Sequence, residues 1–308
     1  MGVLFDRILE FENVKAAWDD VRKGGKTPGV DRMTLRRFGR HWEENLHNLI
    51  AEVRSNRYKP AKLRVVFIPK KHGGWRRLGI PTVRDRIIQR AAMQVLMERY
   101  ERKFLSCSYG YRPKRSVFHA VAAIIKYKDR GFKWVLDADI DNCFDELDHA
   151  FLWNLLEKDI PDTRVLYLLK LWLDVGVVNA AAKKGVSQGM PISPLLANVY
   201  LHELDWRLVR GRWTLVRYAD DFIVLTRSEE QAKQAYRVVG SILEKIHLRY
   251  EPSKTRITSF KEGFRFLGVD FDQHGYKYTW EGKRVKVTSG PGPLWSLWDY
   301  FPHGYEEE

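Results

Sequence analysis

Two neighbouring acidic residues, Asp220 and Asp221, are the first candidates for chemistry in this sequence. They stand between two mainly apolar runs, residues 216–219 and 222–225, and this pattern predicts a strand, a tight turn and a second strand. Because adjacent carboxylates repel each other, the pair requires a compensating charge, and Mg²⁺ supplies one while keeping coordination positions open for phosphates. The alternative is a solvated surface turn, where aspartate is common.

A second acidic stretch strengthens the metal interpretation. In residues 134–141 the even positions are apolar, and the odd positions from Asp137 onward are aspartates, which include Asp139 and Asp141. Period-two alternation predicts a strand with one buried face and one acidic face. If this strand lies beside the hairpin of Asp220, the acids converge into a site for two metal ions about 3.5–4 Å apart. One ion would activate an attacking oxygen, and the other would stabilise the leaving group.

Three segments together resemble the catalytic motifs of reverse transcriptases. Residues 218–221 (YADD) are similar to the YxDD motif of that family, residues 139–145 (DIDNCFD) to its first catalytic motif, and residues 187–195 (SQGMPISPL) to its QGxxxSP motif. The order and the spacing of the three also agree. The resemblance extends from about residue 10 to about residue 270 and implies an RNA-directed DNA polymerase.

The resemblance implies an α+β fold of the right-hand polymerase type, in which a split βαβ palm, similar to an RNA-recognition fold, carries the acids. We expect the fingers from residues 1–116 and 148–186, and the palm with the catalytic site and the primer grip from residues 117–147 and 187–270. Residues 271–308 would form a C-terminal tail that docks on this chain or on a partner. Because these residues are too few for the helical thumb that usually follows, the thumb is absent, atypical or supplied by a partner.

The resemblance also implies roles for the acids in phosphoryl transfer from a deoxynucleotide to a primer 3′-hydroxyl. Asp139 and Asp220 would hold two Mg²⁺ ions, or Mn²⁺ in their place, with Asp221 assisting them. The carbonyl oxygen of Ile140 would be a further metal ligand, and Lys254 would donate a proton to the pyrophosphate.

A basic segment is expected to bind the nucleotide. Residues 63–81 predict a β-hairpin with a Gly-rich tip and a basic face, which would bind the triphosphate; a solvated basic edge strand is the alternative. Arg77 stands where the family usually has proline, which leaves open which arginine reaches the phosphates. The resemblance implies that the nucleotide is bound by Lys70, Arg76, Arg77, Ile140, Phe144, Gln188 and Gly189, and that the primer end is gripped by Phe266, Leu267 and Gly268.

Phe144 is the residue expected to select the sugar. It follows Asp139 by five residues, where the family places a bulky side chain against the sugar 2′ position. Because a ribonucleotide carries a hydroxyl there, Phe144 favours deoxynucleotides. The alternative is that Phe144 packs behind the acidic strand.

Two helix starts are predicted from capping residues. Asn13 is expected to cap a helix whose apolar face includes Val14 and Trp18. Ser228 and Gln231 form a capping box for a later helix.

Composition restricts the partners and the compartment. The net charge of +14 over 308 residues predicts a polyanionic partner, most simply nucleic acid. The two cysteines, Cys107 and Cys143, lack the spacing of a metal site or a disulfide framework, which predicts a reducing cytoplasmic location. No signal peptide or membrane span is visible, so no membrane partner is expected.

The expected partners are an RNA template, a DNA or RNA primer and deoxynucleotides. Residues 217–221 (RYADD) and 201–205 (LHELD) resemble group II intron and CRISPR-associated reverse transcriptases. Ser193-Pro194 argues against the similar enzymes of diversity-generating retroelements, which usually carry Ser-Gln there. The absence of maturase and endonuclease segments favours the CRISPR-associated branch, which acquires spacers from RNA with an integrase complex as partner. The alternatives are a group II intron maturase, which binds RNA and assists splicing, a domesticated reverse transcriptase of another defence system or retroelement, and a non-catalytic RNA-recognition fold.

Overall fold

A computed structural model describes residues 3–69, 74–280 and 283–285. The chain divides into two units: unit 1 joins Met1–Lys103 to Cys143–Tyr200, and unit 2 joins Phe104–Asn142 to Leu201–Glu308. Lys70 and most of the tail lie outside the described residues. The assignment of fingers, palm and tail to residue ranges stays a prediction.

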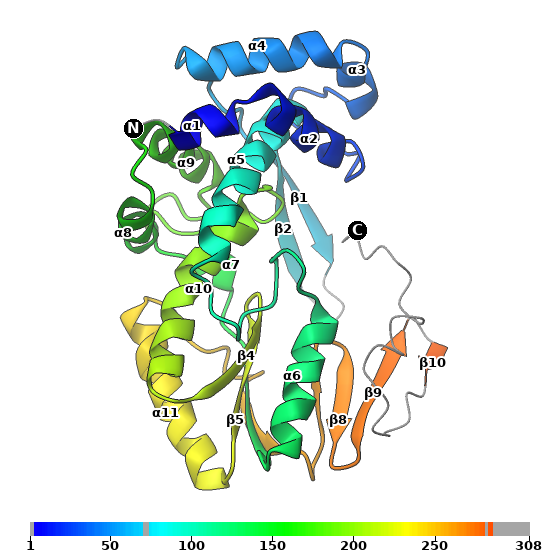
Figure 1. Cartoon of the computed structure of the whole chain (residues 1–308), viewed down its shortest axis with the longest axis vertical. Helices are drawn as coiled ribbons and strands as arrows, with labels where there is room; N and C mark the ends of the chain where they lie inside the picture. Colours follow the sequence, from blue (N-terminus) through cyan, green and yellow to red (C-terminus); the bar gives the residue numbers. More distant parts are fainter. Residues whose placement is uncertain (1–2, 70–73, 281–282, 286–308) are drawn as a thin grey trace. The chain divides into compact units, whose positions relative to one another are not determined.

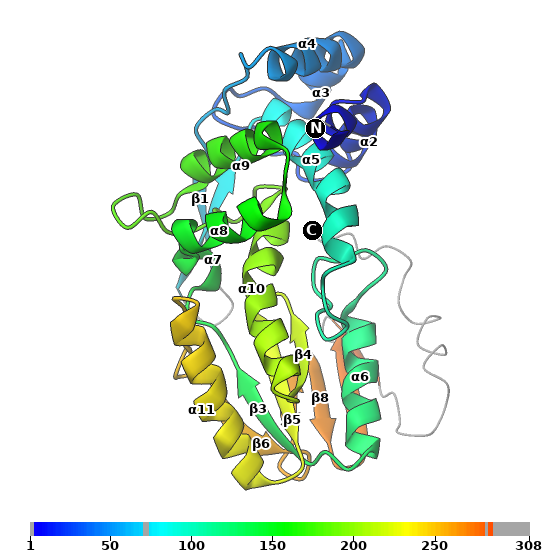
Figure 2. The same ribbon diagram turned by 60° about the vertical axis from the view of Figure 1, so that its left-hand side comes forward.

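Unit 2 is organised around a four-stranded antiparallel sheet in the order β4-β5-β3-β6 (Figures 1 and 2). Its strands are β3 (Trp134–Ala138), β4 (Thr214–Tyr218), β5 (Asp221–Thr226) and β6 (Arg256–Ser259). Strands β3 and β4 run parallel with β5 between them, and β5 and β6 run parallel with β3 between them. This is the double split βαβ arrangement, so the predicted α+β palm fold is confirmed.

Helices cover both faces of this sheet. Strand alternation puts Val135, Ile223 and Leu225 on one face, where they join a buried cluster with apolar residues of α6 (Val117–Asp129). On the other face, α11 (Glu229–Lys245) contacts β3, β5 and β6. Because both faces are covered, the central strands are apolar along most of their length.

A second antiparallel sheet completes unit 2, in the order β10-β9-β8-β7. Its strands are β7 (Phe264–Phe266), β8 (Val269–Asp272), β9 (Gly275–Trp280) and β10 (Lys283–Val285). Phenylalanines of β7 and β8 pack into the cluster that α6 shares with the first sheet, which attaches the second sheet to the first.

Unit 1 is mainly helical. Its helices are α1 (Val3–Ile8), α2 (Phe11–Val21), α3 (Leu35–Gly39), α4 (Trp42–Arg54), α5 (Val83–Glu101), α7 (Cys143–Glu146), α8 (His149–Asp159) and α9 (Thr163–Gly176). A further helix, α10 (Ser193–Arg210), begins in unit 1, and its residues from Leu201 onward belong to unit 2. Among the residues that the structure describes, none of the helices is both long and apolar enough to span a membrane.

The first helix start was predicted wrongly. Helix α2 begins at Phe11, before Asn13, and the Asn13 amide donates hydrogen bonds to the carbonyl oxygens of Ile8 and Ala91 instead of capping. The predicted apolar face is nevertheless buried, because Val14 and Trp18 are 0% and 4% exposed. The second start is confirmed: the Ser228 hydroxyl accepts a hydrogen bond from the Gln231 backbone N–H.

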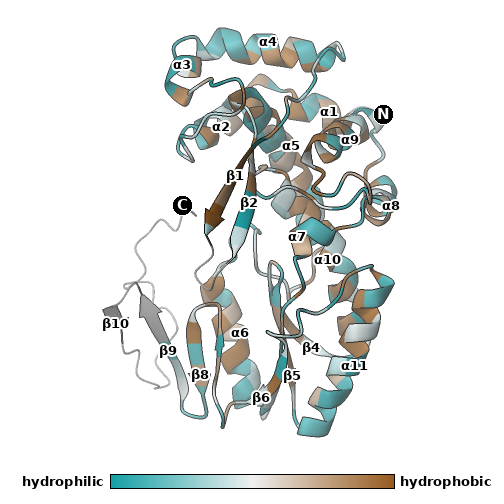
Figure 3. Ribbon diagram, turned by 180° about the vertical axis from the view of Figure 1, so that it is seen from behind, coloured by the Kyte–Doolittle hydropathy of each residue, from teal (hydrophilic) through white to brown (hydrophobic). Residues whose placement is uncertain are grey.

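The predicted basic hairpin is formed by β1 (Arg64–Pro69) and β2 (Trp75–Ile80), which pair in register. Figure 3 shows that β1 is largely hydrophobic, whereas part of β2 is hydrophilic. Phe67 and Trp75 are 62% and 66% exposed, so this hairpin presents large apolar side chains to solvent as well as arginines.

A buried polar network fixes the start of α5. Asp85, only 3% exposed, accepts hydrogen bonds from the hydroxyls of Tyr58 and Thr82, each at 2.7 Å, and from the Ala61 backbone N–H at 3.1 Å. Trp172 of α9 donates to the Tyr58 hydroxyl. Burial raises the pKa of Asp85, against the opposing effect of its hydrogen bonds.

Candidate active site

The two adjacent aspartates lie at the tip of the β4–β5 hairpin. Tyr218 pairs with Asp221, so Ala219 and Asp220 form a two-residue loop between the strands. Ala219 has a φ of +57°, in the left-handed region that residues other than glycine rarely adopt. The tight turn thereby places both carboxylates at one end of the sheet.

Asp139 lies at the same end of the sheet. It follows Ala138, which pairs with Phe222 of β5, so Asp139 comes next to Asp221 across the two strands. The backbone carbonyl of Asp139 accepts a hydrogen bond from the Glu251 N–H at 2.9 Å. The structure therefore places Asp139 beside Asp221 and at the same end of the sheet as Asp220, and Ile140 follows as part of a bridge to Tyr250.

The acids influence one another electrostatically. The pKa of Asp221 is raised to about 7, first by the protein atoms that crowd its carboxylate and then by the negative charges of Asp220, Asp139 and Asp137. Asp221 as a whole residue is nevertheless exposed to solvent. The neighbouring carboxylates thus disfavour the charged form of Asp221, and a cation bound beside them would offset this repulsion.

Basic side chains between α11 and β6, and at the first position of β6, form ion pairs with the three aspartates of residues 137–141. The Lys254 ammonium donates to Asp139 Oδ2 at 2.6 Å, and this hydrogen bond raises the pKa of Lys254. Two further ion pairs extend the series: Arg256 to Asp137 at 3.3 Å and Arg249 to Asp141 at 2.7 Å.

Sequence reasoning had identified Lys254 but not the two arginines. The sequence does show several basic residues in 249–256, and these could have been considered as ion-pair partners of the acidic strand. The register of β3 with β6 assigns Arg256 to Asp137, and the bridge between Ile140 and Tyr250 brings Arg249 to Asp141.

The carboxylates suit a divalent cation chemically. Among the described residues, no three His, Cys, Asp or Glu side chains already converge as a metal site, and the Lys254 ammonium holds one oxygen of Asp139. The ligand atoms that Asp139, Asp220 and Asp221 can offer to a metal are carboxylate oxygens, which hard cations such as Mg²⁺ prefer. The raised pKa of Asp221 also agrees with a place for positive charge. The residues present therefore fit Mg²⁺, once the ammonium moves aside.

Several predicted nucleotide-binding residues come together within unit 1. The Gly79 N–H of β2 donates to the Gln188 carbonyl at 2.8 Å, and a Cβ on Gly189 would lie 2.8 Å from the Gly79 carbonyl oxygen. Arg77 donates to the Ser187 hydroxyl at 3.5 Å, whereas Arg76 is exposed. Only a glycine at 189, where φ is +100°, permits this close approach.

The remaining predicted residues have mixed surroundings. Phe144, in α7, is 7% exposed, and its carbonyl accepts a hydrogen bond from the Val186 N–H. Phe266 is buried in the core of unit 2, while Leu267 and Gly268 form the turn between β7 and β8, both with positive φ. Their roles in sugar selection and primer binding stay predictions.

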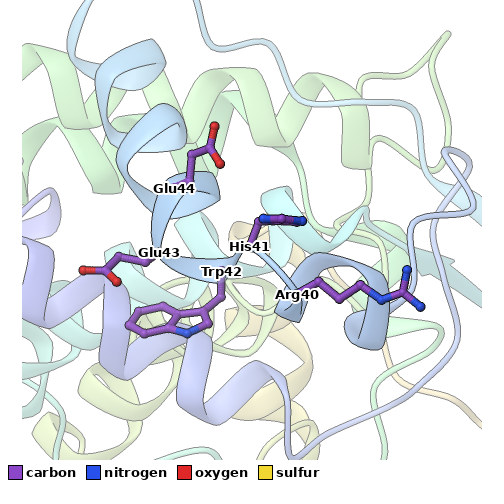
Figure 4. Close-up of a pocket in the computed structure, with 5 residues that line it drawn as sticks. All are labelled: Arg40, His41, Trp42, Glu43 and Glu44. Atoms are coloured by element: carbon purple, nitrogen blue, oxygen red, sulfur yellow. The ribbon is translucent and has the colours of Figure 1, made fainter.

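A surface pocket elsewhere does not resemble a ligand site. It lies in unit 1 at the start of α4 and is lined by residues 40–44. Figure 4 shows that their side chains point in different directions and have no common focus. The acids of unit 2 are accordingly the better candidate for chemistry.

The sheet order, the acidic hairpin and the neighbouring Asp139 together define the palm of a right-hand polymerase. Residues 68–271 match the family described as reverse transcriptase (RNA-dependent DNA polymerase). The chain belongs to the reverse transcriptase family.

Two curated relatives support this assignment. Protein YkfC of Escherichia coli K12 is 35% identical over 292 residues, which cover 80% of this chain and 76% of that protein. The group II intron-encoded protein LtrA of Lactococcus lactis subsp. cremoris is 37% identical over 188 residues, which cover 59% of this chain and 31% of LtrA. The chain therefore spans about a third of LtrA, and the resemblance to group II intron-type reverse transcriptases is confirmed.

A solved telomerase structure agrees with the fold. Apo telomerase from Candida tropicalis, truncated from its C-terminal domain, superposes with a TM-score of 0.57 at 14% identity, covering 77% of this chain and 60% of the telomerase chain. At that identity the likeness concerns the fold alone. A chain of a partial Cas6-RT-Cas1–Cas2 complex is 27% identical and covers 79% of this chain and 41% of its own, with a TM-score of 0.46.

Proposed function

We propose that this protein is an RNA-directed DNA polymerase that extends a primer 3′-hydroxyl with deoxynucleotides on an RNA template. The observation that carries the proposal is the position of Asp139 beside the Asp220-Asp221 hairpin at one end of the sheet, in a member of the reverse transcriptase family. The net charge of +14 suits nucleic acid partners.

The carboxylates of Asp139, Asp220 and Asp221 would hold two Mg²⁺ ions, with the Ile140 carbonyl as a further ligand. When bound, such ions lower the pKa of an attacking hydroxyl and stabilise the charge of the leaving pyrophosphate. Burial and the neighbouring carboxylates raise the pKa of Asp221 to about 7, and a bound cation would favour its ionised form.

Lys254 would change partners during the reaction. Its ammonium now balances Asp139 at 2.6 Å, and its side chain is 66% exposed, so it is free to turn toward an incoming phosphate. The hydrogen bond to Asp139 raises the pKa of Lys254, so leaving Asp139 makes the ammonium a better proton donor for the pyrophosphate oxygen.

In unit 1, the arginines of β2 and the loop of Gln188 and Gly189 would bind the nucleotide. Their hydrogen-bonded packing, with Gly79 against Gln188, holds this loop and the hairpin in one arrangement. Phe144 would exclude the 2′-hydroxyl of ribonucleotides.

Primer extension with Mg²⁺ tests this proposal. The wild-type protein is expected to extend a DNA primer on an RNA template, and Asp220→Asn is expected to abolish extension because a carboxylate ligand is lost. The variant should keep its melting temperature and its affinity for the primer–template, since asparagine is also accepted in turns. Near-wild-type extension by the variant would refute the role of Asp220, and the absence of extension by the wild type would refute the polymerase.

The identity with LtrA favours one second candidate, a maturase-type protein that binds intron RNA and assists splicing. Such a protein would raise the splicing rate of a bound intron, and this effect would survive Asp220→Asn. A splicing assay with the wild type and the variant separates the two functions.

A further inference from the structure

A buried ion pair lies directly behind the acidic hairpin. Arg217 of β4 and Asp205 of α10 are both 0% exposed, and both lie in unit 2. The guanidinium binds the carboxylate through two hydrogen bonds, Nε to Oδ1 at 2.7 Å and Nη2 to Oδ2 at 2.6 Å. This bidentate geometry fixes the plane of the guanidinium group.

The same guanidinium also holds the turn. Its Nη1 donates to the Ala219 carbonyl at 2.7 Å, and Nη2 donates to the Ser108 hydroxyl at 2.8 Å. The Ala219 carbonyl belongs to the peptide group that leads into Asp220. Because Ala219 is in the left-handed region, this peptide needs an outside contact to stay in its observed orientation.

The segment before α6 supports the hairpin from outside. The Arg217 N–H donates to the Cys107 carbonyl, and the Tyr109 N–H donates to the Arg217 carbonyl, each at 2.8 Å. Gly110 then lies against the turn so closely that a Cβ there would be 2.3 Å from the Ala219 nitrogen. No side chain larger than hydrogen fits this position without moving the turn.

We infer that Arg217, Asp205, Ser108 and Gly110 are positioning residues that set the direction of the Asp220 and Asp221 carboxylates. We call these four residues the turn clamp. The inference deepens the proposed function and rests on it. A clamp is required because two adjacent carboxylates repel each other and push the turn away from the geometry that a shared cation needs.

The hydrogen bonds of the Arg217–Asp205 pair indicate a role beyond packing. A buried ion pair can usually be replaced by apolar side chains of similar volume at little cost in stability. An apolar pair cannot donate a hydrogen bond to the Ala219 carbonyl. The guanidinium is the one side chain that can satisfy Asp205, Ser108 and Ala219 together, because its donors are held in a planar fork.

The decisive variant replaces the pair, Arg217→Met with Asp205→Leu in the full chain. Its melting temperature is expected to fall by about 5–15 °C, because the buried Ser108 hydroxyl and Ala219 carbonyl lose their hydrogen-bond donor while the exchange of the ion pair itself costs little. The kcat of primer extension should fall about 100-fold, since small misplacements of catalytic groups have effects of that size. The KM for the deoxynucleotide should change less than about threefold, because the fall reflects the reacting geometry and not substrate binding. A stable double variant with wild-type kcat would overturn the inference.

If the double variant does not fold, Arg217→Lys tests whether the turn clamp positions the carboxylates. Lysine retains the charge opposite Asp205 but cannot reach three acceptors at once. A loss of kcat of about tenfold with KM unchanged is expected, and wild-type kcat in this variant would contradict the clamp.

Gly110→Ala tests the outside contact and has a matched control. Its Cβ would displace the turn, so kcat should fall while the variant remains folded. Gly240→Ala, in α11 of the same unit, places a Cβ at an ordinary 3.4 Å from the Tyr250 ring and should leave kcat unchanged. Equal activity of the two alanine variants would overturn the role of Gly110.

Hydrogen exchange separates the clamp from the polymerase proposal. Backbone amides of residues 219–221 should exchange about tenfold faster in Arg217→Lys than in the wild type, whether or not the protein extends primers. A wild type that extends no primer refutes the polymerase alone, and the exchange rates then decide on the clamp. Unchanged exchange at these amides would refute the clamp alone.

Discussion

The aspartates that follow β3 are each matched by a basic side chain. Asp139 is paired with Lys254, whose side chain is 66% exposed, whereas Arg217 and Asp205 are fully buried. Because the Asp139 side chain is only 16% exposed, the ammonium is the partner that can leave this pair, whereas a fully buried pair is costly to break. Lys254 is therefore suited to exchange with a metal ion, and Arg217 is suited to hold the backbone that carries the acids.

The raised pKa of Asp221 predicts a pH dependence in the metal-free protein. The folded-state pKa is about 7, above the ordinary value near 4 of an unfolded aspartate, so folding favours the protonated form. This contribution to stability is complete below about pH 4 and is lost as the pH rises through about 7. In EDTA, Asp221→Asn should gain melting temperature over the wild type at pH 8 but not at pH 4. An equal difference at both pH values would contradict this prediction.

Phe144 gives a second prediction at this scale. If its ring lies against the sugar, Phe144→Ala should admit ribonucleotides, because a steric barrier of about 3–4 kcal/mol corresponds to several-hundred-fold discrimination. If the ring only packs in unit 1, where it is 7% exposed, the change leaves a cavity that costs about 3–5 kcal/mol of stability. The ratio of kcat/KM for ribo- and deoxynucleotides, measured beside the melting temperature, separates these outcomes. An unchanged ratio with a large drop in melting temperature means that Phe144 is a packing residue.

At the scale of the elements, both acidic segments were predictable because they are local. Alternation in residues 134–141 predicted β3, although the strand ends at Ala138 and Val135 is buried on the face that was expected to be acidic. The apolar runs around Asp220 predicted the β4–β5 hairpin. The start of α2 was not predictable, because Asn13 bonds to Ala91, far away in the sequence. The turn clamp was missed for the same reason: Ser108, Asp205 and Arg217 meet only in the folded chain.

The network of Asp85 predicts how α5 is held. Asp85→Ala leaves the buried hydroxyls of Tyr58 and Thr82 without their acceptor, so the free energy of unfolding should fall by about 3 kcal/mol. Glu229→Ala, which removes the partly exposed partner of Lys233 on α11, is the control and should change stability by less than about 0.5 kcal/mol. Denaturant unfolding measures both values. Similar values for the two variants would show that the network contributes nothing beyond a surface pair.

At the scale of the whole molecule, the net charge of +14 predicts strong salt dependence of nucleic acid binding. Lysine and arginine contacts to phosphates release counterions, so affinity for an RNA–DNA primer–template should fall more than about 100-fold between 50 and 200 mM salt. Fluorescence anisotropy of a labelled duplex measures this slope. Asp220→Asn should give nearly the same slope, since it changes one charge among many, and a flat response in the wild type would show that phosphate contacts do not dominate.

The order of strands in unit 2 has a consequence for how the protein is made. On the ribosome, β3 emerges long before its neighbours, because Leu136 pairs with Val224 and Ile257, both far downstream. Until then, an apolar strand has two unpaired edges, the condition that promotes aggregation of nascent chains. Asp139 reaches its place beside Asp221 only after β5 has been synthesised, and Lys254 arrives later still. The acidic cluster is thus assembled late in synthesis. A chain released before β6 would carry the acids but would leave one edge of β3 unpaired.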